Sequence, residues 1–443
     1  MLGPLLLLAP VAAAAGLTAD IPYEEVKLSN GLQVLLVEDH RLPLVNVDIW
    51  YHVGAGHEVP GRSGFAHLFE HIMFQGSRNV PEDQFFPILE GIGAPLVNGT
   101  TDFDRTNYFE TVPSNQLDVA LWLESDRMGY LLDTLTQERL DNQKDVVRKE
   151  RQQSTENVPY GTAEERFFQL LFPAPHPYNG VVIGSHQDLQ AATLDDVKAF
   201  FQTYYAPNNA TLVIAGDIDA AATKAAVQKY FGDIPQAATP PALVITTKPI
   251  DAERREALTD DVELPRITFG WVTPAAFQPG DAELTLAATV LAEGKSSRLY
   301  TSLVDGKQLA QSVNAYQYPL TQGSVFAIEV LGKPGGDLKK LETEAWAVVQ
   351  KLIKDGPTDA EVTRAKRGWQ ATTLRQLESL GGFGGKADVL NYYNQHTGDP
   401  GYLPKDFARI DAVTTAAIQA ELARSIQATN RVVVTVTPAG GAK

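Results

Sequence analysis

The stretch Gly64-Phe65-Ala66-His67-Leu68-Phe69-Glu70-His71-Ile72-Met73-Phe74 decides how the first half of the chain folds and which chemistry it can carry. Its apolar residues recur at helical spacing, which predicts a helix with one packed face. His67 and His71 are four positions apart, so a helix places both imidazoles within reach of one zinc ion at about 2.1 Å. Glu70 directly precedes His71, which puts its carboxylate where a general base for a metal-activated water must lie.

The order His-x-x-Glu-His reverses the commoner zinc motif His-Glu-x-x-His. The chain has only 8 histidines in 443 residues, so this spacing rarely arises by chance. The alternative is a helix whose histidines merely pack or face solvent. The charged Glu70 on such an apolar segment argues against that alternative, because a buried charge needs a partner.

The length and composition of the chain predict a soluble protein with two domains. At 443 residues the chain is too long for one ordinary core, so two domains are expected. Apolar residues make up 44% and charged residues 21%, which is typical of a soluble globular protein. The formal net charge of −17 argues against nucleic acid or an anionic membrane surface as a partner. The chain has no cysteine, so any zinc ligands must be histidine, aspartate or glutamate.

The N-terminus has the composition of an export signal. Residues 2–16 are apolar and end in a run of alanines, like the apolar core and cleavage site of a signal peptide. We therefore expect residues 1–19 to be a signal peptide and the protein to be periplasmic or secreted. The basic residues that usually precede such a core are missing, and an ordinary apolar tail is the alternative. No other stretch is long and apolar enough to span a bilayer.

A third metal ligand is expected on the long charged helix predicted over Thr136–Gln153. Two histidines and one carboxylate form a standard ligand set for a hydrolytic zinc ion with one open position. Spacing alone does not choose among the acidic residues on this segment or just after it, which are Glu138, Asp145, Glu150 and Glu156. A solvated charged face without any metal is the alternative.

Strand signals surround the histidine helix. Leu32–Val37 and Val45–His52 read as strands, and the second alternates apolar and polar residues. Pro95–Asp102 and Thr106–Val112 read as a hairpin, and Gln116–Tyr130 as an amphipathic helix. The first half is therefore expected to be α+β.

The second half reads as a copy of the first. Leu264–Trp271 resembles Leu42–Ile49 at an offset of 222 positions, and the helix expected after it, Ala282–Leu291, has no histidine. We expect two duplicated domains, each a mostly antiparallel or mixed β-sheet with helices packed on one face. The expected boundaries are 20–235 for the zinc-binding domain, 236–251 for a proline-rich linker and 252–443 for a domain without metal ligands.

The later elements of the second half also have clear signals. Long helices are predicted over Asp337–Lys354 and Thr358–Leu380, followed by the glycine-rich stretch Gly381–Gly385. This stretch lacks the lysine and preceding strand of a phosphate-binding loop, so it reads as a hinge or turn between helices. The last strand is predicted over Arg431–Val436.

Several motifs together resemble the pitrilysin/insulysin family of zinc peptidases, the inverzincins, which includes the mitochondrial processing peptidases. The resemblance covers nearly the whole chain from about Val26. The residues that carry it are Gly64–Gly76, Asn98–Asp102, Arg105–Glu110, Leu121–Met128, Asp141–Glu150, His176–Tyr178 and Tyr205–Asp217.

The resemblance implies roles for individual residues. In the family pattern the glutamate that ends a Val-Val-x-x-Glu run is the third zinc ligand, which corresponds to Glu150 here. His67 and His71 are then the other ligands of Zn2+, and Glu70 is the catalytic base. Asn98, Gly99, Thr100 and Thr101 resemble the edge strand on which a peptide substrate lies as an added β-strand, held mainly through its backbone.

The sequence departs from the family at one pair of residues. Family members often carry an arginine and a tyrosine, after a Ser-Arg-Leu run, that hold the substrate carbonyl. Here the run is Ser297–Leu299, but the two positions read as Val304 and Gln311, and neither can do this work. Tyr316 or Arg298 could substitute for the pair.

Full-length family members enclose a chamber with four such units, whereas this chain has two. The resemblance therefore implies a peptidase subunit that cleaves short or unfolded peptides. Its partner would be a homologous chain that lacks the zinc motif and supplies the arginine and tyrosine. A self-sufficient homodimeric peptidase and a catalytically silent peptide-binding or scaffold subunit are the alternatives.

Overall fold

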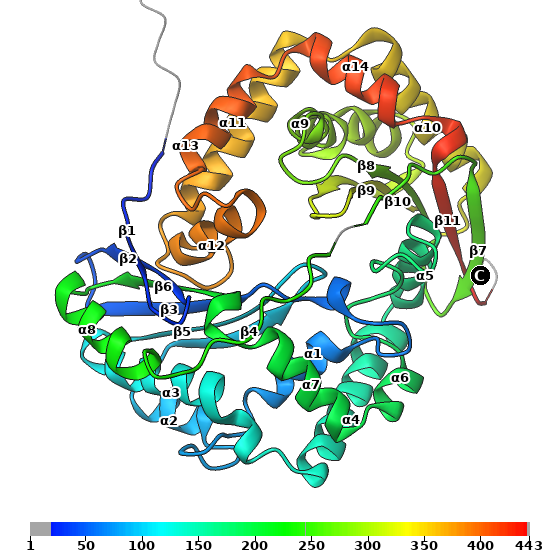
Figure 1. The fold of residues 1–443 in the computed structure, drawn as a ribbon. Helices are drawn as coiled ribbons and strands as arrows, with labels where there is room; N and C mark the ends of the chain where they lie inside the picture. Colours follow the sequence, from blue (N-terminus) through cyan, green and yellow to red (C-terminus); the bar gives the residue numbers. More distant parts are fainter. Residues whose placement is uncertain (1–18, 244, 441–443) are drawn as a thin grey trace, which may run out of the picture.

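The computed structural model describes residues 19–243 and 245–440 and shows two halves, each built on its own β-sheet (Figure 1). The fold is α+β, as the sequence predicts. The predicted signal peptide lies outside the described residues except for its last position. No helix in the described ranges combines the length and the apolar character that crossing a membrane requires.

The first half contains a six-stranded sheet in the order β1-β2-β6-β3-β5-β4. Neighbouring strands are antiparallel except for β2 and β6, which are parallel. The strands are β1 (Glu24–Lys27), β2 (Gln33–Glu38), β3 (Leu44–Tyr51), β4 (Leu96–Thr101), β5 (Thr106–Pro113) and β6 (Ala210–Gly216). The helices are α1 (Phe65–Ile72), α2 (Phe85–Gly91), α3 (Leu117–Tyr130), α4 (Gln137–Arg151), α5 (Gly161–Leu171), α6 (His186–Ala191), α7 (Leu194–Tyr204) and α8 (Ala220–Phe231).

The second half contains a five-stranded sheet in the order β7-β11-β8-β10-β9. Its strands are β7 (Arg254–Asp260), β8 (Arg266–Thr273), β9 (Ala310–Tyr318), β10 (Ser324–Gly332) and β11 (Val432–Pro438). Its helices are α9 (Asp281–Ala292), α10 (Leu338–Asp355), α11 (Asp359–Gln376), α12 (Lys386–Thr397), α13 (Leu403–Ala412) and α14 (Thr415–Ser425). Short 3-10 and π-helical turns are η1 (Ala55–His57), η2 (Ser114–Gln116), η3 (Leu131–Asp133), η4 (Gln152–Glu156), η5 (Pro207–Asn209), η6 (Tyr300–Gly306) and η7 (Ala428–Asn430).

The internal repeat of the sequence is visible in the two sheets. β3 begins at Leu44 and β8 at Arg266, which is the 222-residue offset of the repeated segments. Both strands are central, since β3 lies between β6 and β5 and β8 lies between β11 and β10. The helix that follows is α1 in the first half and α9 in the second. Residues 236–243 and 245–251 form no helix or strand, and the division into separate domains at this point stays a prediction.

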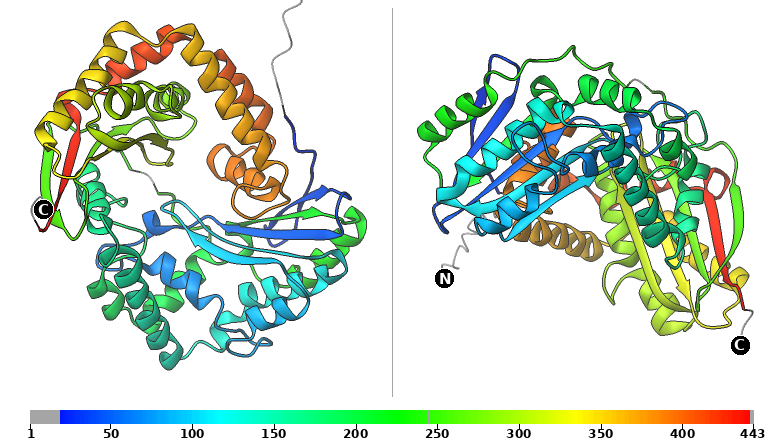
Figure 2. Two further views of the ribbon diagram at one scale, coloured as in Figure 1. Left: turned by 180° about the vertical axis from the view of Figure 1, so that it is seen from behind. Right: turned by 90° about the horizontal axis from the view of Figure 1, so that it is seen from below.

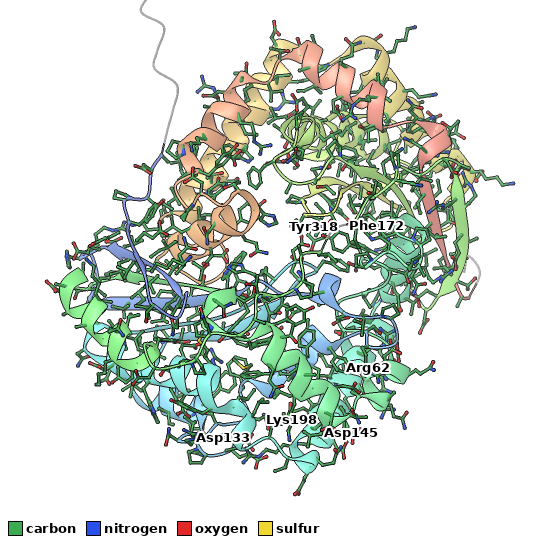
Figure 3. The ribbon with its side chains drawn as sticks, viewed as in Figure 1. Arg62, Asp133, Asp145, Phe172, Lys198 and Tyr318 are labelled. Carbon is green, nitrogen blue, oxygen red and sulfur yellow. The ribbon has the colours of Figure 1, made fainter. Side chains whose placement is uncertain are left out.

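Each sheet is covered on one face by helices of its own half and on the other face by a helix of the opposite half (Figures 1 and 2). On the first sheet, α12 packs against β6 and β3. On the second sheet, α5 packs against β11 and β8. Figure 3 shows Phe172, just after α5, close to Tyr318 of β9 where the two halves meet.

Because each sheet is covered on its second face by a helix of the opposite half, β3 and β11 are buried on both faces. The polar face of β3 carries Asn46 and Asp48, yet both are fully buried, and Asn391 of α12 donates a hydrogen bond of 3.3 Å to the Asp48 carbonyl oxygen. In β11, Val433 packs into the core of the second half, while Val432 faces α5. The consecutive valines of β11 are typical of a strand with two buried faces.

Candidate metal centre

The N-terminus of α1 is anchored by glycine and glutamate residues. Gly64 precedes the helix with φ of 86°, and a Cβ atom there would lie 2.6 Å from the Ile183 carbonyl oxygen. Both facts require glycine at this position. The Glu58 carboxylate accepts hydrogen bonds from the backbone N–H groups of Gly64, at 2.9 Å, and Ala66, at 2.8 Å. These hydrogen bonds satisfy two backbone donors at the start of the helix, so Glu58 fixes where α1 begins.

The apolar face of α1 determines the direction of its polar side chains. Leu68, Phe69 and Ile72 are buried in the core of the first half. Residues three and four apart share a helix face, so this packing leaves His67 and His71 together on another side. Their imidazole rings are 4.8 Å apart, centre to centre.

Glu150 of α4 meets both histidines. Its Oε1 atom lies 3.6 Å from Nε2 of His67, and its Oε2 atom lies 3.0 Å from Nε2 of His71. These three residues each offer a ligand atom within 4.8 Å of the other two. Their side chains are exposed by 12% for His67, 23% for His71 and 39% for Glu150, so the group opens to solvent on the Glu150 side.

The other acidic candidates for the third ligand lie elsewhere. Glu138 and Asp145 are exposed, and Asp145 lies 3.4 Å from Arg148. Glu156 is engaged by Arg151, at 3.1 Å, and by His186, at 2.9 Å. Of the four candidates, the structure therefore brings only Glu150 to the two histidines.

Arg151 fixes the end of α4 that carries Glu150. It is buried and donates hydrogen bonds to the Gly184 carbonyl oxygen and to Glu165, both at 2.6 Å. Sequence reasoning missed this residue, because α4 is rich in arginine and lysine and nothing in the sequence distinguishes the buried one. Through the bond to Gly184, Arg151 holds the helix against the segment that also packs on Gly64.

The donor set fits a zinc ion. Two imidazoles and one carboxylate, each offering a ligand atom within 4.8 Å of the other two, form a common zinc ligand set. Burial, with the neighbouring His71, lowers the pKa of His67 to about 4, so His67 is neutral at neutral pH, which is its metal-binding form. The buried Nδ1 atom of His67 has no hydrogen-bond partner among the described residues.

Glu70 is held beside this group by β4. The Thr101 hydroxyl donates a hydrogen bond of 2.6 Å to Oε2 of Glu70. Burial raises the pKa of the Glu70 carboxyl, and the Thr101 hydrogen bond opposes that rise. Gly99 provides the necessary space, since a Cβ atom there would lie 3.2 Å from Cγ of Glu70. A carboxylate held in this way can accept a proton.

The four residues predicted to bind substrate all lie on β4, the last strand of the first sheet among the described residues. Gly99 and Thr101 face α1 and Glu70, whereas Asn98 and Thr100 face the opposite side. Asn98 is exposed and its Oδ1 atom accepts a hydrogen bond from the Gly99 N–H, at 2.9 Å. The Thr100 hydroxyl donates to Oδ1 of Asn107, at 2.5 Å. Sequence reasoning did not foresee that Thr101 and Gly99 touch Glu70, although a glycine inside a strand often marks a close approach.

Val304 and Gln311, the two positions at which the family pattern has an arginine and a tyrosine, lie in the second half. Val304 packs against the core of that half, and Gln311 is exposed on β9. The Arg298 guanidinium donates two hydrogen bonds of 2.8 Å to the carboxylate of Glu361. The Tyr316 hydroxyl lies 3.4 Å from a glutamate of β10.

Family models match both halves of the chain, and proteins of known family match most of its length. Residues 33–168 match the model of insulinase, peptidase family M16, and residues 191–368 match the model of the peptidase M16 inactive domain. The chain is 33% identical over 361 residues to the zinc protease PqqE of Helicobacter pylori, covering 81% of this chain and 80% of that protein. It is 25% identical to the mitochondrial-processing peptidase subunit beta of Lentinula edodes, covering 81% of this chain and 78% of that one.

Solved structures share the fold. A protease from Helicobacter pylori superposes with a TM-score of 0.88 at 30% identity, covering 94% of this chain and all of that one. The periplasmic protease PqqL from Escherichia coli, at 17% identity and a TM-score of 0.79, shows the same fold, and the match covers 49% of that chain. The chain belongs to peptidase family M16, the insulinase family, whose relatives include proteins named zinc proteases.

Proposed function

We propose that the chain is the zinc-bearing catalytic subunit of an endopeptidase that cleaves short or unfolded peptides. The observation that carries this proposal is the convergence of His67, His71 and Glu150, with Glu70 held beside them by Thr101. The match of the first half to the insulinase model supports it. The second half matches the inactive-domain model, which agrees with its lack of a histidine pair.

In this mechanism His67, His71 and Glu150 would hold a zinc ion, which would supply Lewis acidity to a water molecule and to the substrate carbonyl. Glu70 accepts the proton of the attacking water and then donates it to the leaving amine. The peptide pairs through its backbone with the free edge of β4, so the bond to be cleaved lies near Glu70. Thr101 keeps the Glu70 carboxylate in place through both proton transfers.

Replacing Glu70 by glutamine tests this proposal. The Glu70→Gln chain keeps all three ligands, so its zinc content should equal that of the wild type. Peptide hydrolysis should fall by a factor of about 10² to 10⁴, which is the usual contribution of a general base. The comparison is made in the active assembly, where equal, measurable hydrolysis with both chains would refute the assigned role, and activity without zinc would refute the metal mechanism.

We also propose that the active form is a heterodimer with a homologous chain that lacks the zinc motif. Val304 and Gln311 support this, because neither side chain can stabilise an oxyanion as an arginine and tyrosine pair would. Losing one oxyanion donor typically costs about 3–4 kcal/mol of transition-state stabilisation. Full activity of the purified chain as a monomer would refute the heterodimer, and full activity as a homodimer would favour self-assembly.

A scaffold subunit without activity is the second candidate, and only the Val304 and Gln311 positions favour it.

For the location we propose export to the periplasm or the exterior, supported by the apolar run at residues 2–16. Cell fractionation, with mass spectrometry of the mature N-terminus, tests this. A full-length chain in the cytoplasm would contradict it.

A further inference from the structure

The glycine-rich loop between α11 and α12, residues 381–385, lies flat on the first sheet. A Cβ atom on Gly381 would lie 1.8 Å from Oδ1 of Asn46 in β3, and one on Gly382 would lie 2.8 Å from Cδ2 of Leu96 in β4. Gly384 donates a backbone hydrogen bond of 2.8 Å to the Asp388 carboxylate. The loop is a turn between two helices, which agrees with the predicted hinge or turn, and it also makes close contacts with the sheet.

The one large side chain of this loop is held at the surface. Phe383 is 70% exposed, the highest exposure among the large apolar side chains described. Its ring meets the ring of Phe109 at 5.2 Å with an interplanar angle of 83°, an edge-to-face contact. The loop thus contacts the sheet through Gly381 and Gly382 and presents a single aromatic ring to the outside.

Strand register places this ring beside the free edge of the first sheet. Phe109 of β5 pairs with Asn98 of β4, so their side chains share one face. Leu96 pairs with Thr111 and points to that same face, two residues before Asn98. Next to Leu96 is a hollow of about 470 Å³. Its apolar lining comes from Leu42, Leu44, Pro95, Leu96 and Leu380.

We infer that Phe383 and the hollow at Leu96 are two apolar subsites for alternate side chains of a peptide paired with β4. This inference rests on the proposed function. In an added strand, side chains two residues apart point to the same face. One would therefore meet Phe383 beside Asn98, and the other would enter the hollow beside Leu96. Asn98 and Leu96, which mark the two subsites, lie three and five residues before Thr101, the residue of β4 that contacts Glu70.

Peptide binding to the Glu70→Gln chain tests this without turnover. The probes are two fluorescein-labelled ten-residue peptides of identical composition, serine and threonine with two leucines. In one peptide the leucines are two positions apart, and in the other they are three positions apart. The first should bind about ten times more tightly, because only its leucines reach both subsites.

Adding Phe383→Ala to the same chain should remove most of that ten-fold ratio. Val59→Ala is the matched control, since Val59 is also exposed, at 63%, but lies in the loop before α1. It should keep the ratio, and thermal unfolding should show that both variants are folded. Equal affinities for the two peptides, or a ratio that survives Phe383→Ala, would overturn the inference.

A surviving ratio together with a changed oligomeric state would mean that Phe383 contacts another chain, which also overturns the inference. The proposed function fails in a different way, through missing zinc or through hydrolysis that does not depend on Glu70. Zinc content and hydrolysis are measured separately from the ratio of peptide affinities, so a failure of the proposed function can be told from a failure of this inference.

Discussion

Replacing Thr101 by valine should slow the chemical step without removing zinc. Valine keeps the shape of threonine and suits a strand, but it lacks the hydroxyl that donates the 2.6 Å hydrogen bond to Glu70. A hydrogen bond to a charged group contributes about 1.5–3 kcal/mol. Each 1.4 kcal/mol of barrier is a factor of ten in rate, so kcat should fall by about 10- to 100-fold.

The assay is steady-state hydrolysis of a quenched fluorescent peptide by the active assembly, with zinc measured on the same samples. Thr101→Ser is the matched control, because serine keeps the hydroxyl, and it should retain most of kcat. KM should change little in both variants, since the peptide pairs with the backbone of β4. An unchanged kcat in Thr101→Val, or an equal loss in Thr101→Ser, would refute the idea that this hydroxyl positions Glu70.

Three further predictions concern space, pH and packing. Gly99→Ala places a methyl group 3.2 Å from Cγ of Glu70, so kcat/KM should fall about ten-fold or more with zinc retained, and unchanged kinetics would contradict this. Hydrogen bonds from Arg41 and Lys386 hold the pKa of Asp39 well below its usual value, so their stabilisation is present above about pH 4 and is lost as the pH falls. In urea titrations, Asp39→Asn should therefore be less stable than the wild type by about 1 kcal/mol at pH 7 and by a smaller amount at pH 3, where the unfolded chain is already mostly protonated at this residue but the folded carboxylate is still ionised; an equal deficit at both pH values would contradict the linkage. Phe167→Ala removes the buried ring through which α5 packs on the second sheet, so the free energy of unfolding should fall by about 3–5 kcal/mol. A loss below about 1 kcal/mol would show that this contact is unimportant.

Local pattern was enough to predict the main elements. Helical periodicity predicted α1, and the structure confirms a helix over Phe65–Ile72. The 222-residue repeat predicted a second sheet, and β3 and β8 confirm the offset residue for residue. These predictions succeed because each depends on neighbouring residues or on a direct comparison of two segments.

The sequence pattern did not predict the contacts between residues that are far apart in the chain. The polar face of β3 is covered by α12, and the bond between Asn391 and Asp48 joins residues 343 positions apart. Thr101 reaches Glu70 only because the β4–β5 hairpin lies beside α1. Glu150 could not be chosen from spacing, since four acidic residues fitted equally well, and the family resemblance was needed to single it out.

Zinc affinity of three chains tests the central claim most directly. The wild type, Glu150→Gln and Glu138→Gln are each titrated with zinc against a chelator and analysed for bound metal by mass spectrometry. Glu138 lies on the same helix and is exposed, which makes it a matched control. We predict one zinc ion per chain for the wild type and Glu138→Gln, and a loss of affinity of about 10²-fold or more for Glu150→Gln. A wild-type chain that binds no zinc, or a Glu150→Gln chain with wild-type affinity, would contradict the account.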